Sequence, residues 1–214
     1  MKKYLRAVLM VSAFLFSAEV WAQETNLDMF YGKKDVGGAK FGAEYSVTNN
    51  VYAGFADFYF LTKSKRSNYT DKWPSYFGVE LEGAYAQGKD YHFAGKGNAD
   101  FDAWWGLLWI DGRIYSQDTG KVRPYFETGV GIGTGQLYAN GPKGSSLDFD
   151  KSLNLLRLKG GAGVAFMLSD KYSLDVGVGA DGTVAYIGDM FGSSNLTMAG
   201  VQATVGISRW GEKK

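Results

Sequence analysis

The stretch VRPYFETGVGIGT, residues 122–134, alternates between two kinds of side chain. One set is apolar: Val122, Phe126, Val130 and Ile132. The other set is charged, aromatic or small: Arg123, Tyr125, Glu127, Gly129, Gly131 and Gly133. A period of two places alternate side chains on opposite faces of a β-strand. The stretch therefore predicts a strand with one apolar face and one face of charges and glycines.

The same alternation recurs in residues 75–87, 154–168, 174–181 and 201–208. Glycine weakens a strand, and a solvated outer face of a β-sandwich gives no reason for so many glycines. Inside a narrow barrel, small residues make room for long charged side chains. The pattern therefore favours a transmembrane barrel with apolar faces toward lipid over a soluble sandwich with one wet face.

We predict an all-β, closed, antiparallel, up-and-down transmembrane barrel. Eight strands are expected, at residues 39–47, 51–63, 75–87, 101–117, 122–138, 153–168, 172–187 and 196–210. Ten strands are the alternative, if residues 26–33 form a strand and the 88–100 region contributes another. Tight turns are expected at 48–50, 118–121 and 169–171, and longer polar connections at 64–74, 89–100, 142–152 and 188–195. Short turns at one end and long loops at the other are typical of outer-membrane barrels.

Aromatic residues near strand ends are expected to form the interfacial girdles of such a barrel. The candidates are Tyr52, Tyr59, Trp73, Tyr76, Trp104, Trp105, Trp109, Tyr115, Tyr125, Tyr138, Tyr172, Tyr186 and Trp210.

The N-terminus predicts export. A basic start at residues 1–3 precedes an apolar run over residues 7–18, which is too short to span a bilayer as a helix. Val20-Trp21-Ala22 resembles a cleavage site, so residues 1–22 are expected to be a secretory signal peptide cleaved after Ala22. Residues 23–214 then form one barrel domain.

The composition excludes some classes. The chain has 30 glycines, no cysteine and a formal net charge of +1. Near-neutral charge gives no support for nucleic-acid binding, and the absence of cysteine excludes disulfides. No cofactor or metal is expected from the sequence.

Several stretches resemble the small outer-membrane β-barrel family that includes OmpA-like and opacity-protein-like domains. They are Gly78–Tyr85, Val122–Gly131, Gly161–Gly177 and Val201–Ser208. The resemblance implies an outer-membrane location and assembly by the barrel-assembly machinery, but no single activity. Family members usually end on an aromatic residue, whereas here Trp210 is followed by Gly-Glu-Lys-Lys and lies off the register of Val205 and Ile207.

The candidate site is the set of charges on the inward faces. Buried charges persist only when they are paired and hydrogen-bonded. The set can form either a salt-bridged plug or an ion-conducting pore, and the narrow interior favours the plug. Its members are Glu80, Glu82, Asp111, Arg113, Arg123, Glu127, Arg157, Lys159, Asp175 and Asp181.

Two motifs suggest other chemistry. Residues 129–135 are rich in glycine, but Thr134 breaks the dinucleotide-binding spacing and no helix pattern follows. His92 is the only histidine, and as a base oriented by Asp90 or Asp100 it could serve a lipid-A-modifying enzyme. No nucleophile motif accompanies it, so no catalytic residue is assigned.

The sequence thus favours a non-enzymatic outer-membrane barrel with a structural or surface-interaction role. A lipid-A-modifying enzyme and a narrow channel are the alternatives. Expected partners are outer-membrane lipids and lipopolysaccharide, the assembly machinery, and an extracellular ligand reached through the loops, with no nucleic acid among them.

Overall fold

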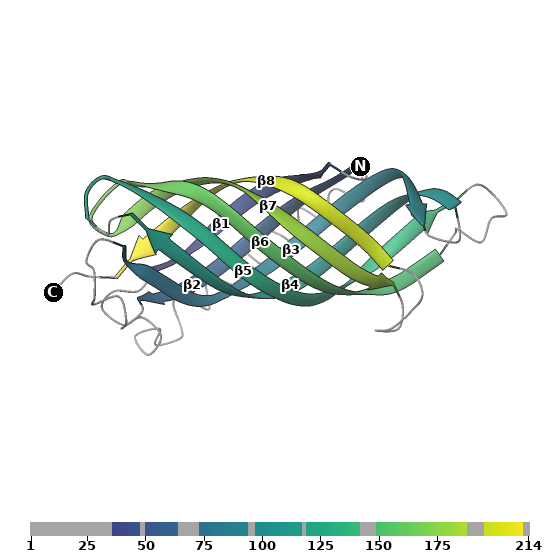
Figure 1. The fold of residues 1–214 in the computed structure, drawn as a ribbon, viewed down its shortest axis with the longest axis horizontal. Coiled ribbons are helices and arrows are strands. Elements are labelled where there is room, and N and C mark those ends of the chain that lie inside the picture. Colours follow the sequence, from purple (N-terminus) through teal and green to yellow (C-terminus); the bar gives the residue numbers. More distant parts are fainter. Residues whose placement is uncertain are drawn as a thin grey trace.

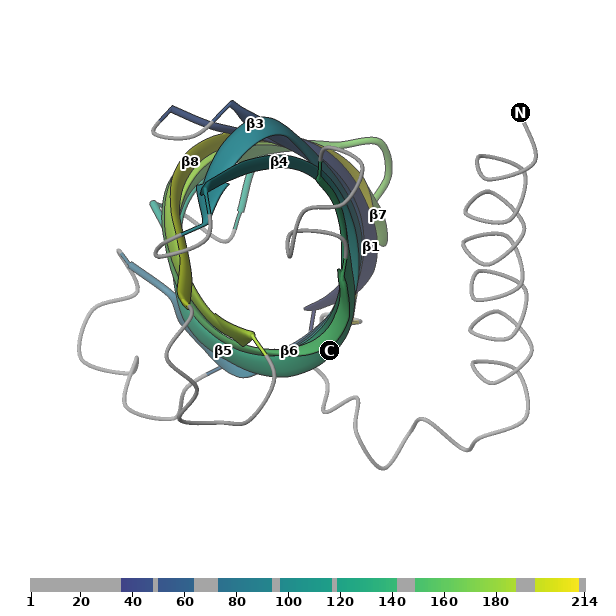
Figure 2. The ribbon, with the colours of Figure 1, turned by 90° about the vertical axis from the view of Figure 1, so that its right-hand side faces the viewer.

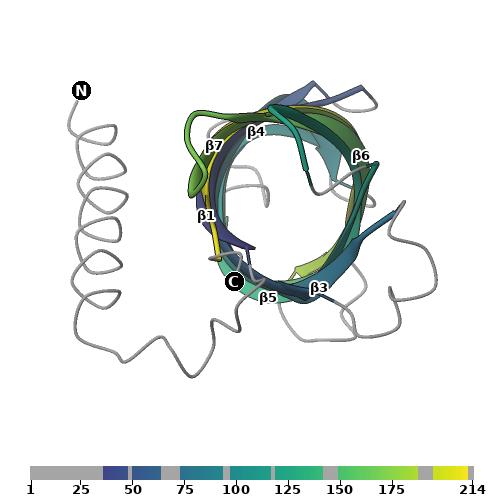
Figure 3. The ribbon, with the colours of Figure 1, turned by 90° about the vertical axis from the view of Figure 1, so that its left-hand side faces the viewer.

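The computed structural model describes residues 36–47, 50–63, 73–93, 97–116, 119–141, 149–187 and 195–211. Eight strands form a closed barrel in chain order, and the end views show the complete ring (Figures 1, 2 and 3). The strands are β1 Val36–Ser46, β2 Val51–Lys63, β3 Ser75–Phe93, β4 Gly97–Tyr115, β5 Val122–Asn140, β6 Phe149–Met167, β7 Tyr172–Ile187 and β8 Asn195–Trp210.

Each strand pairs antiparallel with the next, and β1 pairs with β8 from Val36–Trp210 to Ser46–Gly200 to close the ring. The predicted eight-stranded, up-and-down barrel is therefore confirmed. Residues 26–33 of the ten-strand alternative, and the predicted signal peptide at 1–22, lie outside the described residues. Within those residues, no helix has the length and apolarity needed to cross a membrane.

The predicted connection at residues 89–100 is wrong, because β3 continues to Phe93 and β4 begins at Gly97. A register shift between Gly88 and Tyr91 marks a β-bulge, with Asp90 at a φ of 53°. Lys89 and Asp90 both face outward, and the inward alternation resumes only at Tyr91. The extra residue breaks the period of two, which hid this part of the strand from the sequence pattern. Similarly, β6 begins at Phe149, inside the predicted 142–152 connection.

The predicted separation of short turns from long connections is only partly right. The chain order places the connection after β1 at the same end as those after β3, β5 and β7. The long connection between β2 and β3 instead lies at the end that holds Val36 and Trp210. We call this the terminal end, and the opposite one the hairpin end.

The outer face carries apolar side chains from every strand. Exposed examples are Ile110, Phe126, Ile132, Leu158 and Val178. The strands β3 to β6 each contain 19 residues, about 60 Å at the usual strand rise, whereas crossing a bilayer takes about 9–11 residues. The excess length lies toward the hairpin end, where the outward residues become polar.

The aromatic girdle was predicted too broadly. Tyr52, Trp73, Trp104, Tyr138 and Tyr172 are exposed, and Tyr186 is half-buried. Seven of the candidates instead lie buried inside the barrel: Tyr59, Tyr76, Trp105, Trp109, Tyr115, Tyr125 and Trp210. Position near a strand end does not decide the face, because the face follows from parity along the strand.

Candidate functional site: the charged lumen

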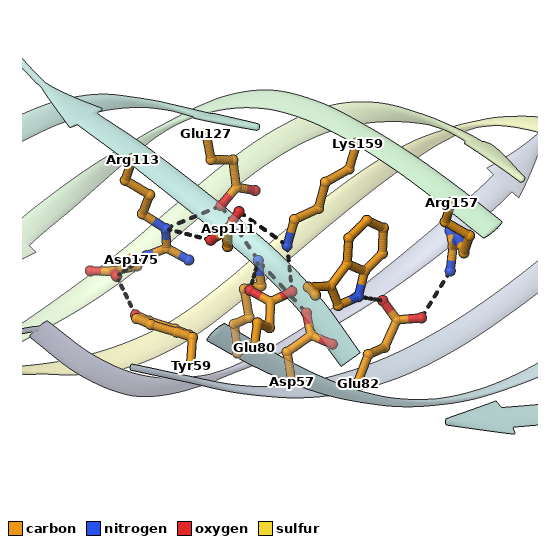
Figure 4. A network of polar contacts seen from close by, with 12 residues as sticks. Asp57, Tyr59, Glu80, Glu82, Asp111, Arg113, Glu127, Arg157, Lys159 and Asp175 are labelled. Atoms are coloured by element: carbon orange, nitrogen blue, oxygen red, sulfur yellow. Dashed lines mark hydrogen bonds and ion pairs between the residues drawn. The ribbon is translucent and has the colours of Figure 1, made fainter. Parts of the chain in front are cut away.

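The lumen holds a layer of charged residues between two apolar layers. All ten charged residues expected there are buried: Glu80, Glu82, Asp111, Arg113, Arg123, Glu127, Arg157, Lys159, Asp175 and Asp181. Lys40 and Glu44 of β1 and Asp57 of β2 are also buried and were missed. Figure 4 shows much of this network, with charges from opposite walls pointing toward one another.

Arg157 of β6 joins three carboxylates, and we call this set the Arg157 cluster. The guanidinium lies 2.6 Å from Glu44 and 2.8 Å from Glu82, and it also contacts Asp181. The Glu82 carboxylate accepts further hydrogen bonds, at 3.0 Å each, from the indole N–H groups of Trp105 and Trp109. The Arg157 guanidinium thus pairs with carboxylates from β1, β3 and β7, and these ion pairs link strands across the interior.

A second set of charges lies nearer the terminal end than the Arg157 cluster does, and we call it the central cluster. Its three cations are Lys40, Arg113 and Lys159. Lys40 lies 3.0 Å from Glu80 and 3.4 Å from Glu127. Lys159 contacts Glu80 and lies 3.6 Å from Asp111. Its other members are Asp57 and Asp175.

Arg113 is enclosed by aromatic rings as well as acids. Its Nε lies 3.2 Å from Glu127, and its guanidinium carbon lies 4.0 Å from the centre of the Tyr59 ring and 5.1 Å from that of Tyr125. Tyr59 also hydrogen-bonds Asp175 at 3.0 Å. Stacking on aromatic rings stabilises a desolvated guanidinium in addition to its ion pairs.

The glycines of β5 provide the space for these long side chains. A Cβ added at Gly131 would lie 2.7 Å from the Trp109 ring, and one at Gly129 would lie 2.9 Å from Lys159 Cε. These contacts are shorter than van der Waals packing allows. The glycine-rich stretch 129–135 is therefore part of a strand that faces large side chains, as its alternation indicates.

The terminal end of the lumen is filled by rings. Tyr115 packs against Tyr76, Tyr125 and Trp210, with ring centres 5.1–5.4 Å apart. Arg123 stacks over Trp210 at 4.2 Å. The departure of Trp210 from the outward register thus has a structural use, because its indole covers this end of the interior.

The hairpin end is filled by a second apolar layer. Tyr91, Phe93 and Phe101 pack edge to face, with ring centres 4.9–6.0 Å apart. Leucine, isoleucine, methionine and alanine side chains from β4 to β8 complete the layer: Ala99, Leu137, Ala139, Leu153, Ala185, Ile187, Leu196 and Met198. Apolar or aromatic side chains therefore lie on both sides of the charged layer.

His92 lies outside the lumen. It is exposed near the hairpin end of β3, with its Nδ1 atom 2.7 Å from the amide oxygen of Asn98. Asn98 in turn donates to Asp90 at 3.1 Å, and Asp100 accepts from the backbone N–H of Asp90. An amide is neither a nucleophile nor an acid, so the Asn98 side chain supplies neither role of an acyl-transfer site.

The comparisons with known proteins concern the fold. No family model and no curated protein sequence matches this chain. Neisserial surface protein A is 12% identical, with a TM-score of 0.44, over 82% of this chain and 94% of its own. Ail, the attachment invasion locus protein of Yersinia pestis, is 13% identical, with a TM-score of 0.38, over 84% and 99%. The N-terminal β-barrel domain of Pseudomonas aeruginosa OprF is 16% identical, with a TM-score of 0.38, over 84% and 98%.

Proposed function

We propose that this chain is an integral outer-membrane β-barrel that is neither an open pore nor an enzyme. Its role would be structural, or it would present its hairpin end to an extracellular ligand. The filled lumen carries this proposal, because a charged layer lies between two apolar layers inside a barrel whose outer face is apolar. Outer-membrane lipids, lipopolysaccharide and the assembly machinery are the partners that such a location implies.

The outer face supports insertion into lipid. Ile110 and Val178 are each 66% exposed, and in water this apolar surface would favour aggregation. Outward hydroxyls on β5 are satisfied by the backbone: Thr128 donates to the carbonyl of Lys159 at 3.2 Å, and Thr134 donates to that of Leu153 at 2.9 Å. Polar groups that face hydrocarbon need such internal partners.

The polar ends of β3 to β6 support a surface role. Their outward side chains form hydrogen bonds with one another. Tyr85 and Gln87 donate to Asp102 at 2.7 and 2.9 Å, and Gln136 donates to Asp150 at 3.0 Å. These residues follow the apolar part of each strand, so they would lie beyond the hydrocarbon. The strands would then hold the hairpin-end connections away from the bilayer.

The filled lumen predicts that the purified protein shows no steady conductance in planar bilayers. Ions would have to pass both apolar layers and the cross-linked charges. An open porin reconstituted in the same lipid serves as the positive control. Replacing Trp109 with alanine removes an indole beside both charged clusters and should increase brief openings. Stable, selective, long-lived openings of the wild-type protein would instead support the narrow channel.

A further inference from the structure

The buried charges of the lumen do not balance. Among the described residues, eight carboxylate side chains and five cationic ones are buried, which leaves a formal surplus of three negative charges. We propose that the lumen binds a hard divalent cation, such as calcium, between Asp57, Glu80 and Glu82. The inference concerns an ion inside the barrel and does not depend on whether the barrel conducts.

The three carboxylates already have the spacing of a metal site. One oxygen of each lies within 4.8 Å of the others, and all three side chains are buried. Asp57 comes from β2, whereas Glu80 and Glu82 are adjacent inward positions of β3. Figure 4 shows the Asp57 carboxylate between the two glutamates, at the boundary between the central cluster and the Arg157 cluster.

Asp57 provides a separate indication of a ligand. Its Oδ1 atom is buried and has no hydrogen-bond partner among the described residues. Its other oxygen has Lys40 at 3.7 Å, but that ammonium lies closer to Glu80 and Glu127. A buried carboxylate oxygen without a donor is costly, since its hydration is lost and not replaced. A bound cation would supply the missing interaction.

The neighbouring cationic side chains do not supply the missing interaction with Asp57 Oδ1, because each already pairs with other carboxylates. Lys159 pairs with Glu80 and Asp111, and Arg157 pairs with Glu82 and two further carboxylates. A divalent ion would reduce the surplus of three negative charges to one. Calcium fits better than magnesium because it accepts irregular oxygen coordination, whereas magnesium requires a near-ideal octahedron.

The apolar layers on both sides of the charged layer determine how such an ion exchanges. Ions in bulk solvent would reach the site only through these layers. The ion should therefore enter while the barrel folds and leave slowly afterwards. Calcium added during folding should be retained, and a chelator added to the folded protein should remove it slowly.

The test is to fold the full chain in detergent with calcium, with magnesium or with chelator, and then remove free metal by gel filtration. Retained metal is measured by elemental analysis. Wild-type protein folded with calcium should keep about one ion per chain. Asp57→Asn should keep none. Asp102→Asn, which changes a half-buried carboxylate on the outer face of β4, is the matched control and should keep as much calcium as wild type.

Terbium gives a second measurement on the wild-type protein, so the result does not depend on a variant that folds. The indole nitrogens of Trp105 and Trp109 lie 3.0 Å from the Glu82 carboxylate, so tryptophan excitation should sensitise emission from terbium bound there. The proposal is overturned if folded wild type retains no calcium and gives no sensitised emission. It is also overturned if Asp57→Asn retains as much calcium as wild type, or if Asp102→Asn loses it.

Discussion

Replacing Arg157 with methionine should destabilise the folded barrel by about 3–5 kcal/mol, because removing one partner of a buried ion pair leaves an uncompensated charge. Here three buried carboxylates, Glu44, Glu82 and Asp181, would lose their shared cation. Methionine retains much of the side-chain volume, so most of the loss reflects charge rather than packing. Equilibrium unfolding in urea, from lipid vesicles, measures the difference.

Arg209→Met is the matched control for this change. Arg209 is exposed on the outer face of β8, and its loss should change stability by no more than about 0.5 kcal/mol. The double variant Arg157→Met with Glu82→Gln should recover part of the loss, since it removes one of the stranded charges. If Arg157→Met were as stable as Arg209→Met, water rather than side chains would compensate the lumen charges.

Arginine at Val178 should reduce the free energy of folding into lipid by about 2–4 kcal/mol, because a charge near the bilayer midplane is poorly solvated. Val178 faces outward on β7, midway between Tyr172 and Tyr186 near the two ends of the strand. Folding into vesicles at increasing urea concentrations gives the value.

Two controls separate the position from the residue type. Val178→Leu keeps the surface apolar, so its free energy of folding should stay within about 0.5 kcal/mol of the wild-type value. Asn140 lies at the polar end of β5. Asn140→Arg should reduce the free energy of folding by no more than about 1 kcal/mol, as expected for a position near or beyond the membrane–water interface. A Val178→Arg protein that folds into lipid as stably as wild type would show that this face does not meet hydrocarbon.

The alternation of apolar residues with charged or small ones predicted the eight strands. Where it was continuous, it also separated inward from outward side chains correctly. Arg123 and Glu127, for example, share the inward face of β5 with Tyr125. That parity also shows why Tyr125 could not be a girdle residue, since a side chain on the charged face points into the barrel. Composition near strand ends gave the opposite expectation and was wrong.

Other features needed the three-dimensional structure. The bulge at Asp90 shifts the alternation, so the hairpin formed by β3 and β4 resembled a polar loop in the sequence. Lys40 and Asp57 do alternate with outward aromatic residues, so the same test applied to β1 and β2 would have found them. Their partners could not have been predicted, because the stagger of the closed barrel decides which residues of non-adjacent strands meet across the lumen.

The apolar outer face should lie in lipid, and the outward residues at the hairpin end should lie in water. The chain has no cysteine, so single cysteines carrying nitroxide labels can be placed along the outward face of β5. Labels at Phe126, Val130 and Ile132 should collide with oxygen dissolved in the bilayer, and labels at Gln136 and Asn140 should collide with a water-soluble nickel chelate. Equal access of the chelate to all five positions would contradict this placement of the barrel in the membrane.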